Sequence, residues 1–132
     1  MKDERTELPL GTKQYALRII GVYEKLPHRT VAQVLGRQAL RSGTSVGANF
    51  REAYRARSTA EFISKLGDCL KELEETAYWL ELLVDSGIIR SSETAHSQDE
   101  TNQLTAILTS IVKKLRSKPL IFSSLIAHPS CP

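Results

Sequence analysis

The sequence is poor in the residues on which compact β folds and disulfide-stabilised domains depend. Aromatic residues make up 6% of the 132 residues, and there are two cysteines, Cys69 and Cys131. So few aromatic residues argue against a β-sandwich or barrel, and two cysteines do not make a disulfide framework. No stretch approaches the roughly 18 consecutive apolar residues that cross a bilayer, and residues 1–11 lack the apolar segment of a secretory signal. These absences predict a cytoplasmic, helical protein with no membrane segment.

Charged residues are present in ordinary numbers but are unevenly distributed along the chain. The net charge is +3, yet residues 28–57 contain six Arg and one Glu, whereas residues 58–86 contain two Lys and seven Asp or Glu. This polarity fits pairing within the fold, pairing between subunits, or a basic surface that meets an acidic partner. The sequence leaves all three arrangements open.

Hydrophobic periodicity and helix-ending residues predict four helices. The predicted helices cover residues 12–26, 30–57, 58–86 and 99–117. Thr30 is expected to cap the second helix, Ser58 and Glu61 form a capping box at the start of the third, and Gly87 ends the third in the left-handed conformation. Short connections between the first three helices predict an all-α, antiparallel up-down four-helix bundle.

One domain accounts for the whole chain, because 132 residues suit a single hydrophobic core. Residues 1–11, which contain a proline and a glycine, are expected to form a frayed leader. The bundle is expected to cover residues 12–118, with residues 88–98 as its longest connection. Residues 119–132 are expected to form a poorly ordered tail.

The third predicted helix carries a coiled-coil-like apolar seam with alternating steps of three and four residues. Its members are Ile63, Leu66, Leu70, Leu73, Ala77, Leu80 and Val84. Trp79, Leu82 and Leu83 fall outside this seam at about 100° per residue. Because one bundle does not readily bury all three, we expect them to form an oligomer interface. Most soluble oligomers have closed symmetry, so a ring is expected.

The second predicted helix carries three stripes when its residues are placed on a helical wheel. The basic stripe consists of Arg37, Arg41, Arg51 and Arg55. The polar stripe, expected on the buried side as a hydrogen-bond network or as the lining of a pocket, consists of Gln38, Ser42, Ser45 and Asn49. The glycine stripe, which predicts that another backbone passes close by, consists of Gly36, Gly43 and Gly47.

Several spaced positions between residues 38 and 84 occur together in one known family. They are Arg41, Ser42, Ser45, Val46, Asn49, Glu52, Phe62, Leu66, Glu75, Thr76, Trp79 and Leu80. On these positions the chain resembles the four-helix-bundle family of 23S rRNA intervening-sequence proteins, over roughly residues 13–117. One departure is Ala53, where members of the family often have glycine.

The resemblance implies a homo-oligomeric, pentameric helical bundle. It also implies association with ribosomal RNA or another nucleic acid. Accessory proteins of diversity-generating retroelements look similar in fold and are basic nucleic-acid binders, which points in the same direction.

Residue combinations that can carry chemistry are present only in incomplete form. Glu93 and His96 form one Glu-x-x-His, but a di-iron bundle needs two such pairs and two further Glu. Arg90 and His96 have the spacing of a HEPN-type ribonuclease, in which histidine moves a proton and arginine holds the phosphate. No histidine is near Cys69 in the predicted helix, as a nucleophile would need. The sequence predicts no catalytic residue, no metal and no cofactor, with the ribonuclease as a remote alternative.

Two principal functions remain. The first is a non-catalytic oligomeric module that binds RNA or DNA, without sequence preference, through the basic stripe and through Lys113 and Lys114 near the end of the last helix. The second is a structural or protein-interaction module in which the basic stripe meets the acidic third helix of a neighbouring subunit. Neither function involves a small-molecule substrate or a membrane.

Overall fold

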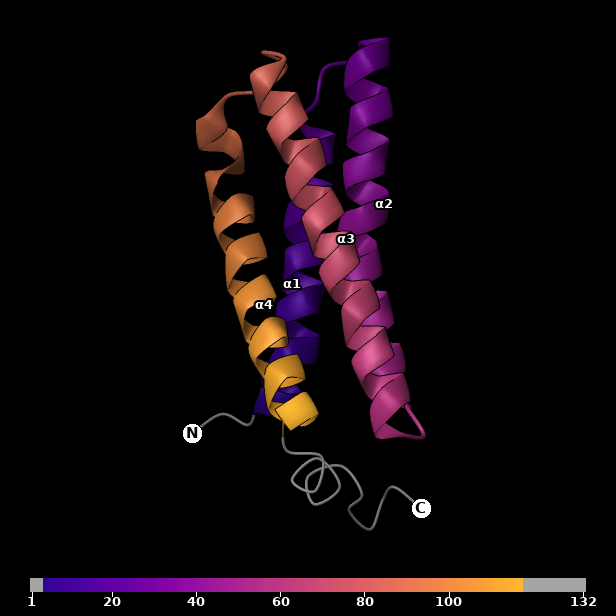
Figure 1. Cartoon of the computed structure of the whole chain (residues 1–132). Coiled ribbons are helices and arrows are strands. Elements are labelled where there is room, and N and C mark those ends of the chain that lie inside the picture. Colours follow the sequence, from indigo (N-terminus) through magenta and orange to yellow (C-terminus); the bar gives the residue numbers. More distant parts are fainter. Residues whose placement is uncertain (1–3, 118–132) are drawn as a thin grey trace.

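The described part of the protein consists of four helices that pack side by side (Figure 1). The structure, a computed structural model, describes residues 4–117. They form α1 (Glu4–Glu24), α2 (Thr30–Ala53), α3 (Thr59–Asp85) and α4 (Ser91–Ser117), with no strand among these described residues. The all-α class predicted from the sequence is confirmed. None of the four described helices is long and apolar enough to cross a membrane.

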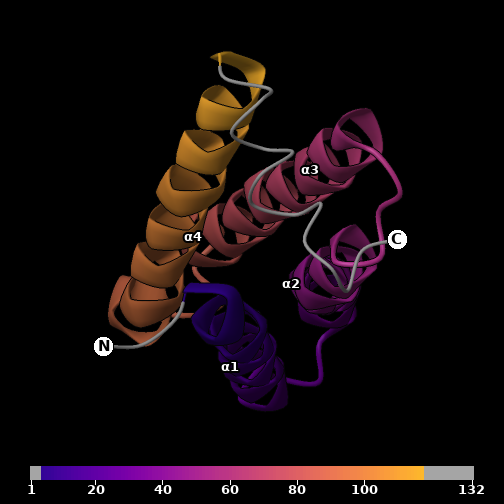
Figure 2. The same ribbon diagram turned by 90° about the horizontal axis from the view of Figure 1, so that it is seen from below.

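The helices follow one another around the bundle in chain order, so each has two neighbours and one outer face (Figure 2). The contact between α2 and α3 is the most extensive, and that between α1 and α4 is the smallest. Where two neighbouring helices touch, the residue numbers increase along one helix and decrease along the other. For example, Cys69 Sγ lies 3.5 Å from the carbonyl oxygen of Val46, whereas Lys65 bonds to Glu52 further along α2.

The first helix begins earlier than the sequence predicts. Residues 4–11 belong to α1 instead of a frayed leader, although Pro9 lies inside the helix. A proline there removes one backbone hydrogen bond close to the helix start. Leu8 is buried against the core and Thr12 is 1% exposed, so packing of this first segment offsets the lost bond. The predicted tail at residues 119–132 lies outside the described residues.

The last helix also begins earlier than predicted. The core-facing positions of its first two turns hold residues with hydroxyl groups, whereas the prediction looked for apolar residues there. Residues 91–98 are helical instead of forming a long connection. The inward positions of this segment are Thr94 and Ser97, both almost fully buried. Their side chains can enter an apolar core because hydroxyl groups bond to the carbonyls of their own helix. Thr94 Oγ1 donates to the carbonyl oxygen of Ser91 at 3.3 Å.

The predicted helix ends are confirmed at α3 and wrong at α2. Ser58 Oγ accepts a hydrogen bond from the backbone N–H of Glu61 at 3.0 Å, as the capping box requires. Gly87 has a φ of 76°, the left-handed conformation that follows many helices. The N-cap of α2 is Arg29 instead of Thr30, without a side-chain cap, and the helix ends at Ala53, not at residue 57.

The core face of α3 is only partly the seam predicted from the sequence. Its fully buried residues are Leu66, Cys69, Leu73, Thr76, Leu80 and Leu83. The predicted Leu66, Leu73 and Leu80 are confirmed, but their inward neighbours are Cys69, Thr76 and Leu83, and the other predicted seam residues are only partly buried. The face is turned because α3 packs against α2 much more extensively than against α4. Leu83 therefore lies in the subunit's own core, and its assignment to an oligomer interface is wrong.

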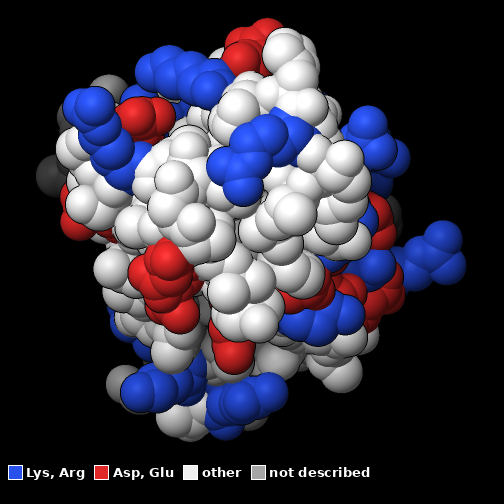
Figure 3. All heavy atoms as spheres, turned by 90° about the horizontal axis from the view of Figure 1, so that it is seen from above, with Lys and Arg blue, Asp and Glu red and all other residues white. Residues whose placement is uncertain are grey.

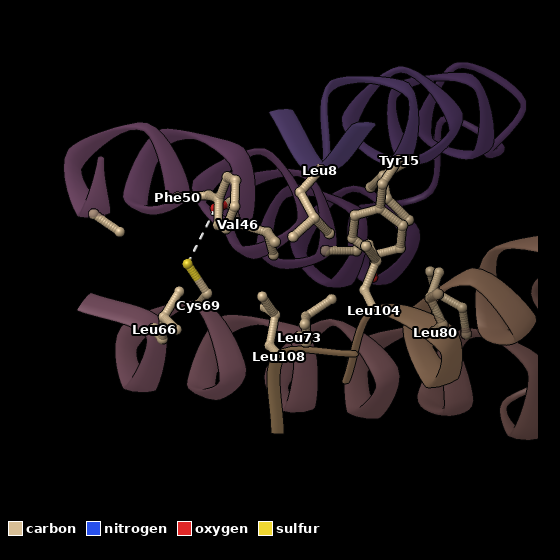
Figure 4. Close-up of a cluster of buried hydrophobic side chains, with 14 of the residues drawn as sticks. Leu8, Tyr15, Val46, Phe50, Leu66, Cys69, Leu73, Leu80, Leu104 and Leu108 are labelled. Carbon is tan, nitrogen blue, oxygen red and sulfur yellow. Dashed lines mark hydrogen bonds between the residues drawn. The ribbon is translucent and has the colours of Figure 1, made fainter. Parts of the chain in front are cut away.

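The glycine stripe of α2 allows α1 to pack very closely, as predicted. A Cβ atom at Gly43 would lie 2.9 Å from Ile19 Cγ1, and one at Gly36 would overlap Leu26 and Tyr23. At Gly47 a Cβ atom would lie 3.3 Å from Thr12 Oγ1. Figure 4 shows the core on the other side of α2, where Val46 and Phe50 face Leu66 and Cys69 across the bundle.

The Gly43 contact predicts a stability effect whose direction opposes helix propensity. Gly43→Ala should lower the free energy of unfolding by about 1–2 kcal/mol, since overpacking against the stiff Ile19 side chain outweighs the gain from replacing glycine. A matched control is Gly11→Ala in α1, where a Cβ atom meets nothing within 4 Å. That substitution should raise stability by about 0.5–1 kcal/mol. Thermal denaturation at one protein concentration tests both, and a Gly43→Ala protein as stable as the parent would contradict the packing argument.

Candidate nucleic-acid interface

Arg37, Arg41 and Arg51 of the basic stripe lie on the outer face of α2, Arg55 lies in the turn after the helix, and all four arginines are exposed. Arg41 differs from the others because α3 holds it. Its NH1 group lies 3.3 Å from Glu72 Oε1 and its NH2 group 2.5 Å from Glu75 Oε1. Within residues 4–117, no ion pair occupies Arg37, Arg51 or Arg55. The stripe therefore contains one structural arginine and three available ones.

A second ion pair also joins α2 and α3. Lys65 Nζ lies 2.7 Å from Glu52 Oε1, and this hydrogen bond raises the pKa of Lys65. Together with Arg41, it shows that part of the charge polarity between the two segments is paired within the fold. Both pairs have at least one exposed member, so each contributes little to stability.

A shallow groove between α1 and α2 adds another cation to the basic face. It is lined by Thr12, Lys13, Ala16, Thr44, Gly47, Ala48 and Arg51. The small residues form the floor, and Lys13 and Arg51 are its exposed cations. Lys13 was missed by the sequence analysis because it lies on another helix, and only the close packing at Gly47 brings it beside Arg51.

The other basic residues do not extend this face. Lys113 and Lys114 are exposed near the end of α4, which lies diagonally across the bundle from α2 (Figure 2). At the opposite end, where α1 connects to α2 and α3 to α4, Lys and Arg alternate with Asp and Glu around uncharged surface (Figure 3). The structure thus separates the predicted contact residues into a face on α2 and a separate group on α4.

The predicted polar stripe is only partly buried. Ser42 is fully buried and donates a 2.9 Å hydrogen bond to the carbonyl oxygen of Gln38. Gln38, Ser45 and Asn49 are partly exposed, and Ser45 donates to the carbonyl oxygen of Arg41 in its own helix. The prediction of a buried stripe is therefore wrong except at Ser42, because the α2 wheel turns the other three toward the rim of the contact with α3.

The buried hydroxyl contacts that do exist join α2 to α3 and α1 to α4. Thr76 Oγ1 lies 2.7 Å from Ser42 Oγ, and Tyr15 OH lies 2.7 Å from Thr101 Oγ1. Thr101 also donates to the carbonyl oxygen of Ser97 at 2.7 Å. Burial raises the pKa of Tyr15. The sequence analysis missed this hydroxyl network because three of its members lie outside α2.

The residues predicted to form an oligomer interface are partly or fully buried, whereas those considered for ribonuclease chemistry are exposed. Trp79 packs partly on its own core, with its Nε1 atom buried and unpartnered among the described residues, and Leu82 is half-buried. Arg90 and His96 are both exposed. No three His, Cys, Asp or Glu side chains within residues 4–117 are close enough to hold a metal ion.

Cys69 is buried between α2 and α3, and burial raises its pKa to about 12. Thiolate forms only as the pH approaches that value, so the native thiol should not react at pH 8. In a Cys131→Ser protein, Ellman's reagent should detect no thiol in the folded state and one thiol in denaturant. Rapid reaction of the folded protein at pH 8 would contradict this burial.

Comparison with known proteins agrees with this fold. The model of the family described as 23S rRNA-intervening sequence protein matches residues 11–110. A crystal structure of a protein with unknown function from the S23 ribosomal protein family of Bacteroides thetaiotaomicron is similar, with a TM-score of 0.75 and 40% sequence identity. The similarity covers 80% of this chain and 97% of that chain. No curated protein matches the chain. The resemblance noted in the sequence is confirmed, and the chain belongs to the 23S rRNA-intervening sequence protein family.

Proposed function

We propose that the protein is a non-catalytic, homo-oligomeric helical bundle that binds RNA or DNA through the outer face of α2. The observation that carries the proposal is the different state of the four arginines. Arg41 is paired to α3, whereas Arg37, Arg51 and Arg55 are exposed without an ion pair in the described part of the chain. The family is named for a 23S rRNA intervening sequence, which supports an RNA setting.

The geometry of the face suits phosphate groups better than bases. The helical part of the stripe, from Arg37 to Arg51, is about 21 Å long at 1.5 Å per residue, enough to follow several nucleotides. Guanidinium groups bind phosphate oxygens with two hydrogen bonds. Contacts of this kind give affinity and position without reading sequence, and they weaken steeply as salt rises.

Assembly strengthens such a face. We propose that the antiparallel up-down bundle associates into a closed homo-oligomer, a pentamer as in the family. Several copies of one weak basic face then act on one nucleic acid, so avidity exceeds the affinity of a single subunit. The charge of each face stays moderate, which keeps binding reversible at physiological salt.

The proposal predicts that charge reversal at the C-terminal end of the basic stripe weakens nucleic-acid binding. The variant Arg51→Glu/Arg55→Glu should bind a 20-nucleotide single-stranded RNA about 10–100-fold more weakly than the parent at 50 mM salt, because two phosphate contacts are lost. Each lost contact should also reduce the slope of log affinity against log salt concentration by about 0.7. Fluorescence anisotropy at several salt concentrations gives both quantities.

The matched control is Lys113→Glu/Lys114→Glu, which changes the net charge equally on α4. Its affinity should fall much less. Equal losses in the two variants would assign binding to net charge instead of the α2 face. A parent protein that binds neither RNA nor DNA at 50 mM salt would overturn the proposed function.

A second candidate is a purely structural module in which the available arginines meet α3 of a neighbouring subunit. It is favoured by Glu74, Glu81 and Asp85, which are exposed on α3. Salt separates the two candidates, since at 1 M salt charges farther apart than about 3 Å are screened. We expect the oligomer to persist in light scattering at 1 M salt while nucleic acid is released. Dissociation into single chains would favour the structural module.

A further inference from the structure

Two aromatic side chains are exposed among the residues that the structure describes. Tyr78 is 53% exposed on α3, and Tyr54 is 44% exposed directly after α2. The charged residues one helical turn away from Tyr78 are all acidic, namely Glu74, Glu75 and Glu81. Their carboxylates repel a polyanion, so the ring of Tyr78 is a poor surface for nucleic acid.

Tyr54 lies among positive charges instead. Arg51 precedes it by one turn on α2, and Arg55 follows it directly. Both arginine side chains are exposed, and no ion pair between described residues involves them. Arg57 is less available, because Glu61 Oε2 accepts its backbone N–H at 3.3 Å. The ring of Tyr54 is therefore accompanied by two available cations of the basic stripe.

The turn after α2 holds Tyr54 and Arg55 close to the end of the helix. The backbone N–H groups of Arg55 and Ala56 each donate to the carbonyl oxygen three residues back, at 3.0 Å. The chain thus continues to coil beyond the last residue of α2, in the tighter manner of a 3₁₀ turn. The nearby carboxylate of Glu52 is already paired with Lys65 on α3 at 2.7 Å. The two arginines and the ring therefore extend the basic face of α2.

A buried aromatic residue supports the ring of Tyr54. The centroids of Phe50 and Tyr54 are 5.1 Å apart and the rings are inclined by 68°, which is an edge-to-face contact. Phe50 is 2% exposed and belongs to the core, as Figure 4 shows. A side chain that is held in this way loses little conformational freedom when a planar group binds to it.

The groove between α1 and α2 leads to the same place. Arg51 and Lys13 are its cations, and small residues form its floor. Arg51 therefore belongs both to the groove and to the surroundings of Tyr54. A nucleic-acid strand whose phosphates lie along this groove reaches Tyr54 one turn further along the chain.

We infer that this end of the α2 face binds single-stranded nucleic acid, with one base stacked on Tyr54 and the adjacent phosphates held by Arg51 and Arg55. The inference rests on the proposed function and names the form of nucleic acid that the face takes. A basic groove beside an aromatic ring is the usual combination in proteins that bind single strands.

The ring distinguishes a single strand from a duplex. A duplex offers its phosphates to the arginines, but its bases are stacked on one another and do not reach a side chain on the protein surface. A single strand offers both phosphates and unstacked bases. Every base has a π face, so a stack on Tyr54 adds affinity without reading sequence.

Replacement of Tyr54 tests the stack. Tyr54→Leu keeps an apolar side chain but removes the ring, so it should bind a 20-nucleotide single-stranded RNA about 5–100-fold more weakly than the parent at 50 mM salt. Its affinity for an RNA duplex of the same length should not change. Because no cation is lost, the slope of log affinity against log salt concentration should also stay as in the parent. Tyr54→Phe keeps the ring and should bind as the parent does. Fluorescence anisotropy measures all of these affinities.

Tyr78→Leu is the matched control, since it removes a similarly exposed ring from the acidic surroundings on α3. It should bind both RNAs as the parent does, and circular dichroism should show all three variants folded. The stack is overturned if Tyr54→Leu binds the single strand as tightly as the parent, or loses affinity for strand and duplex equally. It is also overturned if Tyr54→Phe or Tyr78→Leu is weakened as much as Tyr54→Leu. In each of these cases a parent that binds RNA leaves the proposed function standing, whereas a parent that binds neither RNA nor DNA overturns both.

Discussion

Two pairs of buried hydroxyl groups, with one hydroxyl from each helix, fix how the helices lie against one another. Ser42 and Thr76 join α2 to α3, and Tyr15 and Thr101 join α1 to α4. Sliding α1 against α4 by a single residue would leave the Tyr15 hydroxyl buried without its partner Thr101, at a cost of about 1–3 kcal/mol. Apolar contacts alone tolerate such shifts more easily. The heights of the outer residues, including those of the basic stripe, follow from this register.

The composition of α2 explains why the bundle carries its positive charge on this helix. Its buried residues are mostly glycine, alanine and serine, together with Val46 and Phe50, so α1 and α3 approach it closely. Its arginines are directed to solvent. The arginines therefore extend from a rigid, well-packed helix, which reduces the entropy lost when they bind phosphate.

The sequence was sufficient where a local rule determines the structure. The capping box at Ser58, the left-handed Gly87 and the close approach at Gly43 each depend on a few neighbouring residues. It was insufficient where partners come from distant segments. Thr94 and Ser97 looked like loop residues because they are polar, yet both are buried, and the Thr94 hydroxyl bonds to the carbonyl oxygen of Ser91 in its own helix.

The candidate site, like the fold, was predicted from the sequence only where one helix determines it. The exposure of the basic stripe follows from one helical wheel, and it was foreseen. The pairing of Arg41 with Glu72 and Glu75 was not, since it depends on the register between α2 and α3. The position of Lys13 beside Arg51 depends in the same way on the packing of α1.

The engagement of Arg41 gives the subunit an electrical direction along its axis. Two carboxylates neutralise this arginine, so about 21 Å of helix between Arg37 and Arg51 carries no available cation of the stripe. Arg51, Arg55 and Lys13 concentrate the positive potential toward the C-terminal half of α2. A polyanion that approaches α2 meets a field that is strong toward one end and weak toward the other. Wherever several copies share one orientation, their strong halves gather at a single rim, which a flexible strand reaches first.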